Sequence, residues 1–126
     1  MKTINGIVTL IERAKARAEK SEDWTGYAVQ NRRERHYNWG GPDFVGDMKE
    51  VYRVEYIKGN MTGDVVNLFH YETHTAEVWV ASDAVEMHVY GESRSDADSI
   101  NTFFEYFGIA KRYTFRPVNG GFQEVK

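Results

Sequence analysis

Four histidines, interleaved with glutamates, are the side chains in this sequence most suited to metal chemistry. They are His36, His70, His74 and His88. If the chain between residues 65 and 90 folds back on itself as strands, one outer face of the sheet carries His70, Glu72, Glu77, Glu86 and His88. Two imidazoles and a carboxylate are ligands that a divalent cation accepts. The spacing matches neither HExxH nor a facial triad, and a solvated strand explains the alternation more simply, so we predict no metal site.

Other catalytic machinery is not indicated by the sequence. The chain has no cysteine, which excludes a thiol nucleophile, a thiolate metal ligand and a disulfide. No glycine pattern forms a phosphate loop or a nucleophile elbow, and the spacing of Ser93 and Ser95 places neither beside a histidine. Asp96 and Asp98 are better explained as partners of a helix dipole than as a general acid and base. We therefore predict a protein that is not an enzyme and holds no cofactor.

A basic and aromatic run is the first candidate binding site. Its members are Arg32, Arg33, Arg35, Tyr37 and Trp39. Arginines beside exposed aromatic rings can contact phosphates and stack on bases. The whole chain is acidic, however, with a net charge of -3 and a pI near 5.8. Direct nucleic-acid binding is therefore the second hypothesis for function.

The distribution of charge favours a different surface. Residues 37–105 carry four Lys or Arg against thirteen Asp or Glu, a net charge of -9, and the segments on either side carry +3 each. On the outward face of the expected sheet we place the partner-binding residues Glu77, Trp79, Glu86, His88 and Tyr90. An acidic face with aromatic anchors can occupy a basic groove of a partner protein. Simple solubility is the competing explanation.

Hydrophobic periodicity predicts the elements that position these side chains. Apolar residues at helical spacing indicate a helix over 4–20, and a second helix over about 96–107, capped by Ser95, is expected to pack on the sheet. Alternation indicates strands at 27–30, 37–39 and 50–57, a three-stranded meander over 65–90 and a closing strand from Tyr113 to Arg116. The fold class is therefore α+β, with an antiparallel sheet of about five to six strands.

The meander has a predicted inner face. A turn over 72–75 and another at 82–83 direct one set of side chains toward the core. These are Phe69, Tyr71, Ala76, Val78, Val80, Val85, Met87 and Val89. The alternate positions, including His70 and His88, are expected to face outward.

Length and composition bound the class of protein. The 126 residues suit a single domain spanning 1–126. The longest apolar run is too short for a membrane span, and the N-terminus lacks the pattern of a signal peptide. Together with the absence of cysteine, these observations predict a cytoplasmic protein.

The block from Asn67 to Gly121 carries a resemblance to a known class. It combines Phe69-His70-Tyr71-Glu72-Thr73 followed by Ala76, then a Ser-capped helix containing Ile100-Asn101, and a closing strand that ends at Gly120-Gly121-Phe122. In these features it resembles small phage-encoded proteins, some of which are anti-CRISPR inhibitors of Cas nucleases. The resemblance implies a phage accessory protein that inhibits a host protein, a Cas or other defence nuclease, by covering its nucleic-acid-binding surface. It implies no role for any single residue.

Overall fold

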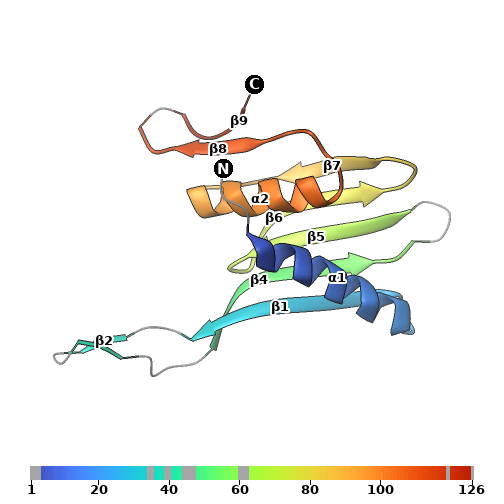
Figure 1. The fold of residues 1–126 in the computed structure, drawn as a ribbon, viewed down its shortest axis with the longest axis horizontal. Helices are drawn as coiled ribbons and strands as arrows, with labels where there is room; N and C mark the ends of the chain where they lie inside the picture. The colour runs from blue at the N-terminus through green and yellow to red at the C-terminus, as the bar shows by residue number, and fades with distance from the viewer. Residues whose placement is uncertain are drawn as a thin grey trace.

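Five antiparallel strands form the main sheet of the protein (Figure 1). The computed structural model describes residues 4–33, 36–38, 41–43, 48–59, 63–118 and 120–125. In spatial order the strands of this sheet are β1 (Thr25–Arg33), β4 (Met48–Ile57), β5 (Asp64–His70), β6 (Thr73–Val80) and β7 (Ala84–Val89). Two smaller antiparallel pairs join β2 (His36–Asn38) to β3 (Gly41–Asp43), and β8 (Tyr113–Arg116) to β9 (Gly121–Glu124).

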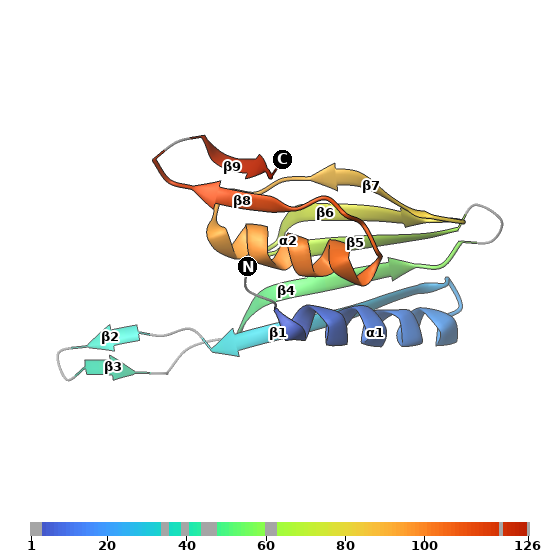
Figure 2. The same cartoon turned by 45° about the horizontal axis from the view of Figure 1, so that its top comes forward.

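Both helices cover the same face of the sheet. Helix α1 (Asn5–Lys20) lies along β1 and β4, while α2 (Arg94–Tyr106) packs against β5, β6 and β8 (Figure 2). The predicted α+β class and both predicted helices are confirmed. Neither helix is long and apolar enough to cross a membrane.

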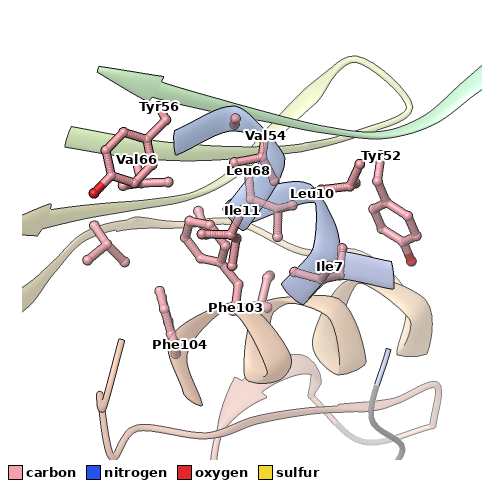
Figure 3. Close-up of a cluster of buried hydrophobic side chains, with 14 of the residues drawn as sticks. Ile7, Leu10, Ile11, Tyr52, Val54, Tyr56, Val66, Leu68, Phe103 and Phe104 are labelled. Atoms are coloured by element: carbon pink, nitrogen blue, oxygen red, sulfur yellow. The ribbon is translucent and has the colours of Figure 1, made fainter. Parts of the chain in front are cut away.

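The core fills the space between the helices and the sheet. The predicted apolar stripe of α1 is buried, and its residues Ile7 and Ile11 are fully enclosed. Figure 3 shows this stripe facing Val54 of β4 and Leu68 of β5, with Phe103 of α2 closing the cluster. Burial of such a stripe stabilises the two-layer arrangement, since about 25 cal/mol is gained for each Å² of apolar surface removed from water.

The start of α2 differs by two residues from the prediction. The capping side chain is Ser93 instead of Ser95, and its Oγ accepts a hydrogen bond from the backbone N–H of Asp96 at 3.1 Å. The same Asp96 is the predicted acidic residue of the first turn, where a negative charge compensates the helix dipole.

The predicted turn between β5 and β6 is wrong. The strands are joined by a two-residue turn at Tyr71 and Glu72, whose φ angles of 49° and 70° are those of a type I′ hairpin turn. Phe69 therefore pairs with His74, and a bulge separates this pair from Leu68 and its partner Ala76. As a result Leu68 and His70 face the core, while Phe69 faces outward with His74.

The predicted inner face of β7 is confirmed for Val89, which packs against the core, but is wrong for Val85 and Met87. A second bulge, between Glu77 and Val78, places Val78 opposite Glu86. Glu86 thus lies on the helix side of the sheet, and Val85 and Met87 are about half exposed, at 53% and 48%. A bulge adds one residue to a strand and so exchanges the faces of all residues beyond it.

The predicted closing strand is one half of a C-terminal hairpin. Buried Asn101 of α2 fixes it, because its Nδ2 donates to the carbonyl of Tyr113 at 2.9 Å and its Oδ1 accepts from the N–H of Tyr113 at 2.8 Å. The ring of Tyr113 stacks on Phe122 of β9 with centroids 5.3 Å apart. The amide of Asn101 therefore acts as a strand partner for β8.

A pair of glycine substitutions tests the contact between α1 and β1. A Cβ at Gly26 would lie 2.1 Å from the carbonyl oxygen of Ala14 and 2.4 Å from the nitrogen of Ala18, both backbone atoms. We expect Gly26→Ala to lower the free energy of unfolding by about 1–3 kcal/mol, measured by urea denaturation. The control is Gly6→Ala in α1, whose Cβ would meet only the movable end of Gln30 and should stabilise by up to about 1 kcal/mol. Equal effects of the two changes would contradict the close packing.

Candidate functional site

The face of the sheet opposite the helices is the candidate site. Strand pairing aligns one row of outward side chains across all five strands: Tyr27, Glu55, Asn67, Glu77 and His88. Parallel to it runs a second row, which contains Val29, Arg53, Phe69 and His74. Within the described part of the chain no helix or strand packs on this face. We call these residues, together with Val65, Trp79 and Val85, the outer face.

Hydrogen bonds join the polar side chains in the middle of the outer face. Asn67 Nδ2 donates to Glu55 Oε1 at 2.9 Å, and His74 Nε2 donates to Asn67 Oδ1 at 2.9 Å. Because the carboxylate can only accept, Asn67 must present its oxygen to His74, which fixes the proton of His74 on Nε2. His88 Nε2 donates to the backbone carbonyl of His74 at 3.0 Å. The polar side chains in the middle of the outer face therefore form an ordered network.

Two imidazole rings stack within this network. The ring centroids of His74 and His88 are 4.5 Å apart, with the planes inclined by 17°. Burial and the neighbouring His88 lower the pKa of His74 below its ordinary value, although Glu77 at 4.0 Å opposes the effect. The neutral form of His74 is thus favoured in the folded protein.

Trp79 is the most prominent aromatic side chain of the outer face. It is 46% exposed, and its indole Nε1 donates to Glu77 Oε2. In the strand register it lies between Val65 and Val85, which gives the indole apolar neighbours on both sides. The tryptophan is therefore exposed yet held in place, as anchor residues of protein interfaces are.

A cation–π cluster occupies the other end of the outer face. The guanidinium of Arg53 lies 5.0 Å from the ring centroid of Phe69 and 5.9 Å from that of Tyr27. The same guanidinium pairs with Glu50 at 3.2 Å. Aromatic rings and arginine are the residue types that protein interfaces favour.

Only part of the predicted acidic face exists. Glu77, Trp79 and His88 lie together as predicted. Glu86 lies on the opposite side, where it accepts a hydrogen bond from the hydroxyl of Tyr113 at 2.9 Å and pairs with Lys111 at 3.5 Å. Tyr90 follows the end of β7 and donates to the carboxylate of Glu92. The register of β7 separates these residues, so the acidic character of the outer face comes from Glu55 and Glu77.

The predicted basic and aromatic run is described in part. Arg33 belongs to β1 and Tyr37 to β2, but their side chains, like Arg35 and Trp39 as a whole, lie outside the described residues. Arg32 is exposed, and its guanidinium donates to the hydroxyl of Tyr71 at 3.3 Å. The ammonium of Lys49 lies 5.7 Å from the centroid of the same tyrosine ring.

Tyr71 is a surface residue that the sequence analysis assigned to the core. It is 41% exposed at the tip of the β5–β6 turn. Its partners, Arg32 of β1 and Lys49 of β4, are adjacent across two strands. A two-residue turn has no composition signal here, because neither Tyr71 nor Glu72 is a glycine or asparagine.

Metal ligands are not grouped in the described residues, since no three His, Asp or Glu side chains lie close enough to hold an ion. Of the two histidines expected to share a face, His88 lies on the outer face and His70 on the inner one.

Comparison with protein families, curated proteins and solved structures finds no match for this chain. The geometry of its own residues therefore carries the functional argument.

The depressed pKa of His74 predicts a loss of stability on acidification. The unfolded chain takes up a proton near the ordinary value of 6.5, whereas the folded protein does so only at lower pH. The contribution of His74 to the free energy of unfolding is therefore fully present above about pH 6.5. It is lost as the pH falls from there toward the pKa that His74 has in the folded protein. Urea denaturation at a series of pH values should show a shallower loss for His74→Gln than for the wild type.

The matched comparison for this variant is its behaviour above pH 7. There both proteins should respond to pH in parallel, because His74 is neutral in the folded and the unfolded chain. A variant that loses stability below pH 6.5 as steeply as the wild type would show that His74 does not contribute to the pH dependence of the free energy of unfolding.

Proposed function

We propose that this protein acts by binding another protein through its outer face. The observation that supports this most directly is Trp79, a large exposed side chain fixed by Glu77 and flanked by valines. Tyr27, Arg53 and Phe69 add the aromatic and arginine content that distinguishes interface centres from ordinary surface. The surrounding polar groups already have partners, so burying them under another protein leaves few unpaired.

The charge near Trp79 defines the chemistry of the partner. Glu77 is its acidic neighbour on β6, Glu55 lies two strands away in the row of Glu77, and Asp83 is exposed in the turn that follows β6. A partner with a basic surface around an apolar pocket complements this arrangement. Such surfaces are typical of proteins that hold nucleic acid.

A host defence nuclease is the partner class that we propose to test first. The resemblance to phage-encoded inhibitors motivates this choice, and the acidic surroundings of Trp79 suit a basic nucleic-acid channel. Inhibition would then follow from occlusion, because the bound protein covers residues that otherwise contact the phosphate backbone. No chemical step by this protein is required.

The test is inhibition of target cleavage by a panel of Cas nucleases loaded with guide RNA. We expect the wild type to inhibit at least one of them. Trp79→Ala should raise the concentration needed for half inhibition by about 30-fold, as the loss of an anchor residue worth about 2 kcal/mol predicts. The matched control is Tyr106→Ala, an exposed aromatic on α2 in the other layer, which should not change inhibition.

Two results would contradict the proposal in different ways. Inhibition that is equally strong in Trp79→Ala would exclude the outer face as the binding surface. Inhibition of no nuclease in the panel would remove this partner class.

A second function, direct nucleic-acid binding, is favoured by the exposed ring of Tyr71. Arg32 and Lys49 flank this ring with two positive charges, an arrangement that can stack a base and contact its phosphates. This cluster lies at the end of the sheet where β1 leads into the β2–β3 hairpin (Figure 1). It shares no residue with the outer face.

Gel-shift titration of single-stranded DNA at two salt concentrations tests the second function. If it is correct, the wild type binds, and the double variant Arg32→Gln/Lys49→Gln binds more weakly, with a salt slope lower by about 1.4 in log–log units. The control double variant Lys15→Gln/Lys20→Gln changes the net charge equally but on α1, and should keep most of the binding. Equal weakening by both variants would show that only net charge matters.

A further inference from the structure

A hollow of about 350 Å³ opens where the β5–β6 turn, the end of β7 and the start of α2 meet. It is lined by His70, Tyr71, Thr73, Tyr90, Glu92, Ser93, Ser95 and Asp96. These residues come from two segments of the chain, 70–73 and 90–96, and none belongs to the outer face. The volume suits a single side chain or a small molecule.

A buried histidine–aspartate pair forms the inner wall of this hollow. His70 is only 7% exposed, and its Nδ1 donates to Asp96 Oδ1 at 2.5 Å. Its ring stacks on Tyr52 with centroids 4.5 Å apart and planes inclined by 14°. Burial acts to raise the pKa of Asp96, but the hydrogen bonds from His70 and from the N–H of Glu92 are stronger in sum and lower it. Asp96 therefore remains a carboxylate.

The second nitrogen of His70 is available to a ligand. Among the described residues Nε2 has no hydrogen-bond partner, and it is not one of the polar atoms sealed from solvent without a partner. When the ring carries a single proton and Nδ1 holds it for Asp96, Nε2 is an acceptor. A side chain that lines the hollow and is more than nine-tenths buried thus has one ring nitrogen without a partner among the described residues.

Several hydrogen-bond donors around the hollow already have acceptors within the protein. The N–H of Glu92 donates to Asp96 Oδ2 at 2.8 Å, and the N–H of Asp96 donates to Ser93. The hydroxyl of Tyr90 donates to the carboxylate of Glu92. Among the lining side chains, what remains is mainly acceptor capacity, on the imidazole and the two carboxylates, with the hydroxyls of Thr73 and Ser95 able to serve in either role. These side chains therefore favour a ligand that brings hydrogen-bond donors.

An exposed aromatic ring favours a planar cation. Tyr90 lines the hollow and is 43% exposed. The ring of Tyr71, in contrast, already contacts the ring of His70 and the ammonium of Lys49. A guanidinium has five donors in one plane, stacks on aromatic faces and pairs with carboxylates through two parallel hydrogen bonds. The dipole of α2 does not favour an anion here, because Asp96 and the cap already occupy the start of the helix.

We propose that this hollow is a binding site for a guanidinium group. Glu92 and Asp96 supply the negative charge, Nε2 of His70 accepts one N–H, and the ring of Tyr90 holds the plane of the cation. The group can belong to a free small molecule or to an arginine side chain of a protein. The site does not depend on the outer face, so it stands or falls separately from the proposed function.

Titration of the full-length protein with methylguanidinium, at constant ionic strength and neutral pH, tests the site. The NMR signals of the His70 ring should shift in a saturable manner, while methylurea, a neutral molecule of similar shape, should produce no saturable shift. Glu92→Gln should weaken the binding by about tenfold or more, because a charged hydrogen bond becomes a neutral one. The matched control is Glu72→Gln, an exposed glutamate on the adjacent turn that does not line the hollow.

Further measurements distinguish an arginine side chain from a free small molecule as the source of the guanidinium group. A blocked arginine that binds more tightly than methylguanidinium would indicate an arginine side chain as the ligand, and equal binding would indicate a free small molecule. Tyr90→Ala should weaken binding without removing the His70–Asp96 pair. The proposal is overturned if methylguanidinium leaves His70 unshifted, if methylurea binds as well, or if Glu72→Gln weakens binding as much as Glu92→Gln.

Discussion

The register of the β5–β6 hairpin is the constraint on which the rest of the structure depends. The turn uses only Tyr71 and Glu72, both in the left-handed region, and a bulge follows within the first residues of β6. The period of a strand is two, so this register alone decides which side chains meet the helices. It directs Leu68 and His70 inward and leaves Phe69 and His74 on the open side.

The inward position of His70 ties the hairpin to the second helix. Its hydrogen bond to Asp96 joins β5 to the first turn of α2, a sequence separation of 26 residues. Asn101, five residues further along α2, holds the backbone of β8 through a pair of hydrogen bonds. Polar side chains at helix positions facing the sheet thus fix where α2 lies, while the apolar residues between them supply the burial energy.

The fold could be predicted from the sequence to the level of class and elements. The stripe from Ile7 to Ala18 and the alternation in β4 are strong periodic signals, and both are found as predicted. The faces of β5 and β7 could not be predicted, because a two-residue turn without glycine and two bulges leave no mark in composition. Phe69 is apolar and faces outward, whereas Glu86 is charged and faces inward, so alternation of residue type is misleading there. Consequently, of the five residues predicted to share the outward face, only Glu77, Trp79 and His88 do so.

The same hairpin orders the outer face, on which the proposed binding depends. Glu55, Asn67 and His74 satisfy one another before any partner arrives, and the imidazole of His88 is fixed on the backbone of β6. Desolvation of unpaired polar groups and the ordering of side chains are both costs of association. A partner that covers these residues meets few unpaired groups and has few side chains to order. Trp79 is likewise restrained by Glu77. An open sheet face carrying isolated polar side chains would lose much more on burial, so it is the network that suits this face to the proposed binding.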